Sequence, residues 1–236
     1  MRFHERRFAE EYDKRLSDEG YPGNLLNVIL DNLSGSTVLD IGAGSGFFSI
    51  PLAEKGYFVT AIEPSMEMIR IFRRKTHPEI AQRIIIIHSD WESFSGEKYD
   101  CALCAHSIYP MKDMKIAVKK MKATAQRTLL LVKHHSNSLS DTLRRSFLNI
   151  RNSETIAVSI IKILRDENIP YSCNEVKQVR EHVIHDLEEE VRYYCDFLGI
   201  DTTESDRVRK IILAHAYARS GSYVYKSEYQ DKLLIF

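Results

Sequence analysis

Between residues 37 and 133 the spacing of hydrophobic and polar positions switches regularly between two periods. Short apolar runs rich in β-branched residues, such as the four consecutive isoleucines within 83–88, predict buried strands. Segments with helical spacing separate these runs, and strands alternating with helices predict βαβ units around a parallel sheet. The predicted strands are 37–41, 57–62, 83–88, 98–105 and 127–133, and the predicted helices are 47–55, 65–75 and 113–124.

Helical patterns flank this region on both sides. Residues 1–33 have amphipathic spacing that is interrupted by a turn at 20–23. Because no linker rich in Pro, Gly or Ser separates a second unit, we expect 1–236 to form a single domain. After residue 134 we expect helices at 140–168, 186–198 and 202–218, a strand at 171–184, and a closing hairpin at 222–236 whose last strand is 233–236.

The composition narrows the class of protein. The chain has 236 residues, with 33 Lys and Arg against 33 Asp and Glu, so its formal net charge is zero. Since binding to a phosphate backbone normally needs a basic excess, nucleic acid is disfavoured as the main partner. No apolar run approaches the roughly 18 residues of a membrane span, and residues 1–7 lack the apolar stretch of a signal peptide. Four cysteines in a chain of this length predict no disulfide framework, so we expect a cytoplasmic protein with no membrane partner.

A glycine-rich turn directly after the first predicted strand is the most informative segment. Glycines let the backbone turn sharply and let a ligand approach the main chain closely. A dinucleotide site needs G-x-G-x-x-G/A, but Phe47 stands where that pattern requires Gly or Ala. Asp40, just before the turn, would repel a pyrophosphate and suits an ammonium group instead. Glu63, at the end of the second strand, can accept both hydroxyls of a ribose. The glycines of the turn are Gly42, Gly44 and Gly46.

At these positions the sequence resembles the class I S-adenosylmethionine-dependent methyltransferases. The first motif of that family, an apolar strand ending in D/E-x-G-x-G-x-G, is complete from Val38 to Gly46. The second motif matches Glu63, the third matches Asp90, and a looser fourth matches 99–103. The resemblance implies an α/β, Rossmann-like, doubly wound, mostly parallel seven-stranded sheet with helical additions at the N-terminus and after strand five. It implies a lid at 1–33, a cofactor-binding core at 36–133, and helical additions with closing strands at 134–236.

The same resemblance implies S-adenosyl-L-methionine as the cofactor and assigns residues to it. Asp40 would hold the ammonium group, and Glu63 would bind the ribose hydroxyls. Asp90 would accept a hydrogen bond from the adenine amino group, Met66 would pack on one adenine face, and Trp91 would lie beside the ring. Without the motif, Met66 and Trp91 would be interpreted as packing residues. The cofactor-binding glycines would be Gly42, Gly44 and Gly46, of which the first two pass under the methionine portion.

Candidates for the methyl acceptor follow strands four and five. His106 is the candidate base or acceptor-orienting group, and its alternative is a role in capping the loop or binding water. Tyr109 and His134 are candidate substrate-binding residues, although Tyr109, before a proline, could serve only loop packing. Because adjacent residues in a strand point to opposite sides, at most one of His134 and His135 faces the site, and we expect no metal.

These observations predict an S-adenosylmethionine-dependent methyltransferase that acts by in-line displacement on a small-molecule acceptor. RNA or protein methylation is the alternative within the enzyme class, and a non-catalytic protein that binds a nucleoside cofactor is an alternative outside it. A nicotinamide-dependent oxidoreductase is a further alternative. The sequence does not indicate an oligomeric state.

Overall fold

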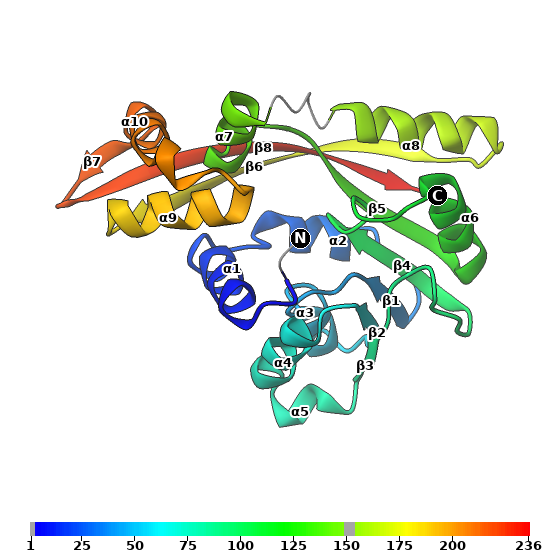
Figure 1. The fold of residues 1–236 in the computed structure, drawn as a ribbon. Coiled ribbons are helices and arrows are strands. Elements are labelled where there is room, and N and C mark those ends of the chain that lie inside the picture. Colours follow the sequence, from blue (N-terminus) through cyan, green and yellow to red (C-terminus); the bar gives the residue numbers. More distant parts are fainter. Residues whose placement is uncertain (1–2, 149–153) are drawn as a thin grey trace.

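The computed structural model describes residues 3–148 and 154–236, and a single sheet runs through these residues (Figure 1). Its strands, in chain order, are β1 (Thr37–Ile41), β2 (Phe58–Glu63), β3 (Ile84–His88), β4 (Tyr99–Ala105), β5 (Ala125–Ser136), β6 (Ser172–Ile184), β7 (Tyr217–Arg219) and β8 (Ser222–Ile235). The order across the sheet is β3-β2-β1-β4-β5-β8-β6, and β7 pairs with β8 off this path. The strands β1 to β5 pair in parallel, whereas β8 is antiparallel to both β5 and β6. The predicted mostly parallel α/β sheet is confirmed.

The closing segment differs from the prediction. Residues 222–236 do not form a hairpin, because β8 is one strand that runs from Ser222 to Ile235 without a turn residue inside it. The turn lies just before it, at Ser220 and Gly221, where φ is 49° and 80°. Two consecutive residues with positive φ are typical of a two-residue hairpin turn. The predicted helix 202–218 is therefore shortened, because 217–219 form β7 and pair with β8.

Helices cover both faces of the sheet (Figure 1). They are α1 (Arg6–Asp18), α2 (Asn24–Leu30), α3 (Ser49–Glu54), α4 (Met66–Lys75), α5 (Pro78–Ala81), α6 (Met114–Thr124), α7 (Leu139–Phe147), α8 (Glu154–Asp166), α9 (Leu187–Leu198) and α10 (Ser205–His215), with a 3-10 turn at Thr202–Glu204. The predicted helix 140–168 corresponds to α7 and α8, and its part at 149–153 lies outside the described residues. None of the described helices combines the length and the apolar character that crossing a bilayer requires.

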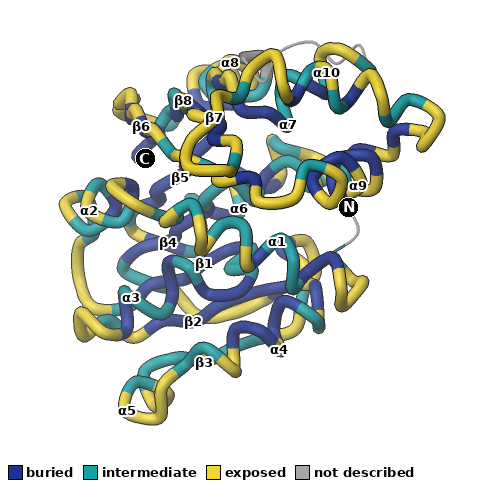
Figure 2. The backbone as a smooth tube through the Cα atoms, turned by 90° about the vertical axis from the view of Figure 1, so that its left-hand side faces the viewer, coloured by how far each residue is buried: buried dark blue, intermediate teal, exposed yellow. Residues whose placement is uncertain are grey.

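The central strands are buried on both faces because each face has its own apolar cluster. On one face α6 and α8 pack against β4 and β5, and on the other α2 and α3 pack against β1 and β5. Figure 2 shows this burial in the middle of the sheet, with more exposed backbone at β3 and α5. The isoleucine run of 84–87 lies in the edge strand β3, where Ile85 is 61% exposed.

Helix α1 joins the first half of the sheet to the C-terminal helices. On one side its Ala9 packs with Met68 of α4. On the other side Phe8 stacks on Phe197 of α9, with ring centroids 5.6 Å apart, and Arg15 Nη1 donates to Glu190 Oε2 at 2.7 Å. Helix α1 is thus held from both sides, by α4 and by α9.

A buried hydroxyl in β5 provides a test of the packing. Thr128 is fully buried, and its Oγ1 has no hydrogen-bond partner within the described part of the chain. We expect Thr128→Val to raise the free energy of unfolding by about 1 kcal/mol, because it removes an unsatisfied polar atom and keeps the shape. Thr128→Ser is the control. It keeps the hydroxyl but removes the buried methyl group, so it should lower the free energy of unfolding. Urea unfolding measures both, and a less stable Thr128→Val would contradict the packing described here.

Candidate cofactor and acceptor site

The glycine turn connects β1 to α3 at the carboxyl edge of the sheet. All three glycines have positive φ, with values of 74° at Gly42, 57° at Gly44 and 86° at Gly46. The turn is fixed to β2, because the N–H groups of Gly42 and Ala43 both donate to Ile62 O, at 2.9 and 3.0 Å. Helix α3 begins only at Ser49 and has six residues, so it is shorter than the predicted 47–55. The turn's own backbone, rather than a long helix, therefore forms this edge.

The three glycines are needed for different reasons. A Cβ on Gly42 would lie 2.4 Å from Ser107 Cβ, and one on Gly46 would lie 2.6 Å from the Phe72 ring. Both glycines are therefore required by the packing of the turn itself. A Cβ on Gly44 would meet nothing within 4 Å, so this glycine borders open space. Gly44 is where a ligand can approach the main chain.

Asp40 is buried at the end of β1, directly before the turn. It is 2% exposed, and Ser49 Oγ donates to its Oδ2 at 2.6 Å. Burial, with a smaller contribution from the charge of Glu63, raises the pKa of Asp40 to about 7, against the lowering effect of the hydrogen bonds from Ser49. A carboxylate that is destabilised in this way gains from a cation, which fits the predicted contact with an ammonium group.

Glu63 lies at the end of β2 and is also buried, and its side chain is hydrogen-bonded to the glycine turn. Its Oε2 accepts from Gly44 N and its Oε1 accepts from Ser65 N, both at 2.8 Å. Burial raises the pKa of Glu63, although these two backbone donors oppose the shift. A carboxylate has about four acceptor positions, so two remain for a ligand that presents two hydroxyls. The backbone bonds hold the side chain in one orientation before any ligand binds.

The three residues predicted around the adenine differ in their surroundings. Met66 begins α4 and is 37% exposed, so its side chain is available to a ligand. Asp90 is exposed after β3, and hydrogen bonds from the Ser93 side chain and from Ser93 N, which lies 2.7 Å from Asp90 Oδ1, lower its pKa. Trp91 is 4% exposed, stacks on Phe94, and donates from Nε1 to Ala117 O at 3.3 Å. Its indole is thus part of the core, and a contact with adenine remains a prediction.

His106 lies directly after β4 in a left-handed conformation, with φ of 56°. The backbone N–H of His106 donates to Leu131 O of β5 at 2.9 Å. Burial, together with the charges of Lys133 and Arg180, lowers the pKa of His106 to about 3, so the ring is neutral at physiological pH. A neutral imidazole with so low a pKa is a poor base. Of its two predicted roles, this environment favours the orientation of an acceptor.

The other two acceptor candidates contact β5 and β6. Tyr109 Oη accepts from Lys133 N at 2.7 Å, and burial raises the pKa of Tyr109 above its ordinary value. His134 occupies the β-bulge in β5, where the pairing with β8 shifts between Lys133 and His135. The pKa of Glu175 on β6 is lowered mainly by its hydrogen bond with Lys232 and by the charge of Lys232. Lys177 and His134 make smaller contributions in the same direction. The roles of Tyr109 and His134 in binding substrate remain predictions.

The N-terminal helix and the closing strands add residues that the sequence analysis did not assign. Asp13 of α1 accepts from Ser45 Oγ in the glycine turn at 2.5 Å and from Lys75 Nζ at 2.7 Å. Asp231 of β8 is 1% exposed and lies 3.7 Å from His106, measured from Oδ2 to Nε2. One sequence signal could have revealed Asp231. In a strand every second residue points to the same face, so Asp231 is expected on the same face as the buried Leu233 and Ile235.

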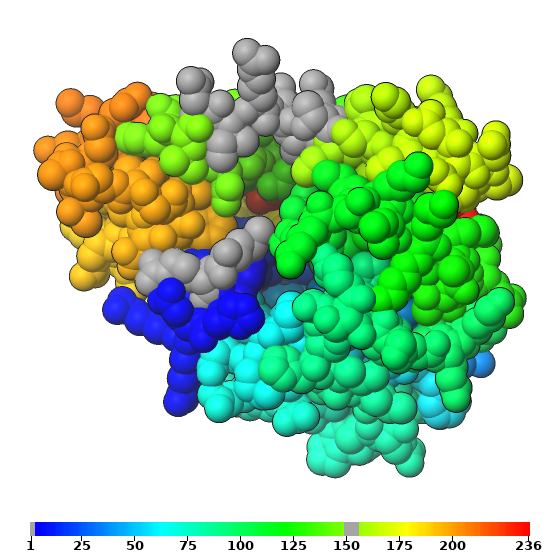
Figure 3. All heavy atoms as spheres, turned by 45° about the vertical axis from the view of Figure 1, so that its right-hand side comes forward, coloured from blue at the N-terminus to red at the C-terminus, as the bar shows by residue number. Residues whose placement is uncertain are grey.

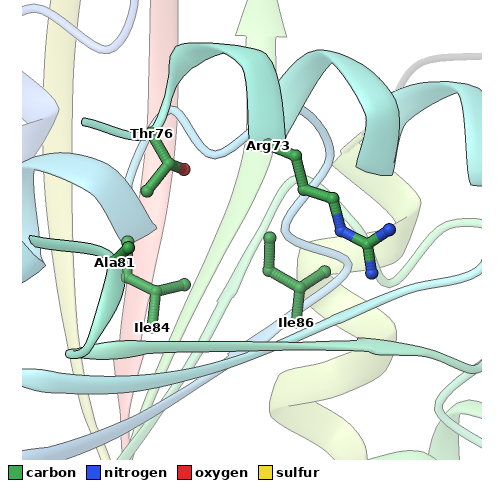
Figure 4. Close-up of a pocket in the computed structure, with 5 residues that line it drawn as sticks. All are labelled: Arg73, Thr76, Ala81, Ile84 and Ile86. Carbon is green, nitrogen blue, oxygen red and sulfur yellow. The ribbon is translucent and has the colours of Figure 1, made fainter. Parts of the chain in front are cut away.

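The surface is hollowed where these elements meet. Figure 3 shows a depression between α1 (blue), the segment around α6 (green) and the C-terminal helices (gold and orange), with atoms of β8 (red) at its back. A separate cavity of about 320 Å³ lies on the other side of α4, against β3. Figure 4 shows its lining of Arg73, Thr76, Ala81, Ile84 and Ile86. That lining combines Arg73 and Thr76 with three apolar residues and contains none of the carboxylates at the strand ends, so we assign no cofactor to it.

Comparison with known proteins identifies the class. The sequence profile of a family described as a methyltransferase domain matches residues 6–173. Magnesium protoporphyrin IX methyltransferase of Arabidopsis thaliana is 29% identical over 118 residues, which are 48% of this chain and 38% of that protein. Glycine/sarcosine N-methyltransferase of Aphanothece halophytica is 29% identical over 104 residues, which are 41% of this chain and 38% of that protein. The chain thus spans well under half of the length of these curated relatives.

Solved structures agree on the fold. The crystal structure of magnesium protoporphyrin IX methyltransferase from Synechocystis, with bound SAH, superposes with a TM-score of 0.51 and 19% sequence identity. The match covers 88% of this chain and 80% of that chain. The fold is therefore that of the Rossmann-like methyltransferases. With the profile match over most of its length, the chain belongs to the class I S-adenosylmethionine-dependent methyltransferase family.

The open side of the turn yields a prediction about its glycines. Gly46→Ala should destabilise the fold strongly, because the new methyl group meets the Phe72 ring as well as an unfavourable φ. Gly44→Ala has only the φ penalty, about 1–2 kcal/mol, but should weaken cofactor binding because its methyl group occupies the open space. Thermal melting and calorimetric titration separate the two effects, and equal destabilisation by both changes would contradict this assignment.

Asp40 yields a prediction about pH. The pKa of Asp40 is about 7 in the folded chain, above the ordinary value of 3.8. Between about pH 4 and pH 7 the folded chain therefore holds a proton on Asp40 that the unfolded chain has lost. The stability of the ligand-free protein should therefore fall as pH rises from about 4 to 7. Asp40→Asn should remove this loss and be more stable at pH 8, by at least about 1 kcal/mol, while binding cofactor more weakly. Unfolding at pH 4.5 and pH 8 tests it, with exposed Asp31→Asn as the control for net charge. If the difference in free energy of unfolding between Asp40→Asn and the wild type is the same at both pH values, the result is inconsistent with a buried charge at Asp40.

Proposed function

We propose that this chain binds S-adenosyl-L-methionine at the edge of β1, β2 and β3 and directs its methyl group to a small-molecule acceptor. One observation carries the proposal. Two buried carboxylates, Asp40 and Glu63, end adjacent parallel strands beside Gly44, the glycine that borders open space. The single sheet that runs through the described residues also supports the proposed single domain, with a lid at 1–33, a core at 36–133 and additions at 134–236.

The residues at this edge fit the chemical groups of the cofactor one by one. Asp40 has a raised pKa that a nearby ammonium group would relieve, and Glu63 keeps two acceptor positions for the ribose hydroxyls. Gly44 gives access to the backbone for the methionine portion, between Gly42 and Gly46. Met66 offers an exposed thioether for one face of the adenine. We propose Asp90 for the adenine amino group and Trp91 for the side of the ring.

The chain's contribution to the reaction is alignment. S-adenosylmethionine supplies an already activated methyl group when it is bound. The protein has to hold an acceptor in line with that group and keep water away. Helix α1 contacts the turn through the Asp13–Ser45 bond, and His106, next to Asp231, is the proposed acceptor-orienting residue. We propose Tyr109 and His134 as further walls of the acceptor pocket.

A small molecule is the acceptor class that the surroundings support. The hollow in Figure 3 is bordered by α1 and by the C-terminal helices, and a hollow enclosed in this way supports a compact ligand rather than a polymer lying across it. The names of the two curated relatives refer to small molecules, a magnesium porphyrin and glycine or sarcosine. The equal numbers of basic and acidic residues support the same preference.

Calorimetric titration of the full chain tests the cofactor assignment. We expect S-adenosylmethionine to bind and Glu63→Ala to weaken it roughly tenfold or more, since a hydrogen bond to a charged group contributes about 1.5–3 kcal/mol. Glu54→Ala, an exposed carboxylate at the end of α3, is the matched control and should bind as the wild type does. Tight binding of NADH instead would overturn the assignment.

The catalytic part needs a separate readout. Release of S-adenosylhomocysteine should occur with members of a metabolite panel and not with total RNA or with unrelated folded proteins. Turnover with RNA alone would replace the small-molecule acceptor by the RNA alternative. Cofactor binding without turnover of any acceptor would support the non-catalytic alternative.

A further inference from the structure

A buried carboxylate on β8 is not used by the cofactor assignment. Asp231 Oδ2 accepts from Gln178 Nε2 at 2.8 Å, within the pair β6 and β8. Its Oδ1 is buried too, and among residues 3–148 and 154–236 it has no hydrogen-bond partner. An unsatisfied buried carboxylate oxygen lowers the stability of the fold. Leu233 and Ile235 occupy the same face of β8, so an apolar residue at 231 would suit the strand better.

His106 lies next to this carboxylate and also has a buried polar atom without a hydrogen-bond partner among the described residues. Its Nε2 lies 3.7 Å from Asp231 Oδ2, and its Nδ1 is buried with no hydrogen-bond partner in the described part of the chain. The left-handed φ of 56° is a strained conformation for a residue other than glycine, and β5 holds it through Leu131 O. Two unsatisfied groups and a strained residue at one place indicate a site whose partner comes from outside the chain.

Tyr21 joins this place to the glycine turn. Its ring lies edge-on to Phe47 and Phe48, with centroids 5.1 and 5.8 Å apart, and 6.5 Å from the His106 ring. The two phenylalanines directly follow Gly46. Asp231 and His106 are therefore next to the cofactor edge rather than at a remote position.

The cations around Asp231 have partners of their own. Arg180 is stacked between Tyr21 and Tyr229, at 4.7 and 4.5 Å, and donates to Gln178 Oε1 at 3.0 Å. Lys133 Nζ donates to Asp141 Oδ2 at 3.1 Å. The groups that the structure places directly against the Asp231 carboxylate, Gln178 and the neutral His106, carry no charge. Among the described residues, Asp231 Oδ1 is thus left without a hydrogen-bond donor.

We propose that Asp231 and His106 form the acceptor subsite, and that they take a small molecule whose nucleophilic nitrogen or oxygen carries a proton. Asp231 Oδ1 accepts the hydrogen bond from that N–H or O–H, and His106 Nδ1 orients the acceptor. This proposal rests on the proposed function and specifies its substrate as an amine or a hydroxyl compound.

The proton has a defined destination in this arrangement. It moves from the acceptor nitrogen or oxygen to Asp231 Oδ1, and the electron pair of the broken N–H or O–H bond stays on the acceptor atom. The carboxylate becomes a neutral carboxyl group, which later returns the proton to solvent. Acceptors whose nucleophilic atom carries no proton to lose, for example thioethers, cannot use this step.

The step depends on pH because it needs the ionised carboxylate. Burial raises the pKa of Asp231 to about 6, against the bond from Gln178 and the charges of Arg180 and Lys133. Use of the acceptor should therefore fall as pH drops below about 6 and Asp231 takes up a proton. The titratable and charged groups that face Asp231 or act on it from the packed elements are His106, Lys133, Arg180, Tyr21 and Tyr109.

The experiment measures acceptor binding apart from turnover. The full chain is saturated with S-adenosylhomocysteine, and saturation-transfer NMR screens a panel of primary amines, secondary amines and phenols against size-matched thioethers. For the ligands found, Asp231→Asn should weaken binding roughly ten- to hundredfold, the loss typical of a bond to a charged group. Glu175→Gln on β6, an exposed carboxylate paired with Lys232, is the matched control and should bind as the wild type does.

A second variant separates the two residues. His106→Asn should weaken binding of the same ligands and leave the decline below pH 6 in place, whereas Asp231→Asn should abolish that decline. Thermal melting identifies a variant that has failed to fold, and Asp231→Asn keeps the shape of the side chain.

Each outcome decides the matter. Binding of proton-bearing ligands that is lost in Asp231→Asn supports the subsite. Binding of thioethers only, unchanged binding in Asp231→Asn, or no ligand from the panel overturns it. If the wild-type chain does not bind S-adenosylhomocysteine, the proposed function itself fails, and that result is distinct from the failure of the subsite alone.

Discussion

The burial of two carboxylates at the ends of neighbouring parallel strands is the constraint on which the site depends. Asp40 and Glu63 lie on β1 and β2, each under 10% exposed, and the charge of Glu63 adds to the raised pKa of Asp40. Glu63 is compensated by two backbone N–H groups, whereas Asp40 has the Ser49 hydroxyl. The fold therefore holds a buried, only partly compensated carboxylate beside an open glycine, and a cationic, hydroxyl-bearing ligand would stabilise it further.

The remainder of the molecule encloses this edge. Helix α1 bonds to the turn through Asp13 and to α9 through the buried ion pair of Arg15 with Glu190. Breaking such a pair by removing one partner is strongly destabilising, so the cover and the C-terminal helices are fixed together. The antiparallel strand β8 then brings Asp231 to His106, from a position more than a hundred residues away in the sequence. Cofactor and acceptor sides thus come from different parts of the chain and meet at the strand ends.

Sequence reasoning succeeded where the signal is local. The apolar runs predicted the strands of the parallel sheet, because a strand buried on both faces needs continuous hydrophobic residues. It was less successful near the C-terminus, where the turn at Ser220 and Gly221 ends a helix early and makes β8 a single strand. Trp91 shows another limit, because its position beside Asp90 says nothing about which side of the strand end its indole occupies, and the indole packs into the core.

The sequence by itself determined the class of fold, the glycine turn and the acidic residues that follow the strands, because each of these is encoded within a few neighbouring residues. Only the tertiary structure decided that Gly44 is the open glycine, that Asp13 closes the turn, and that Asp231 lies against His106. These features depend on which surfaces meet when distant segments pack. Burial and unsatisfied hydrogen bonds are properties of that packing, and no short stretch of sequence carries them.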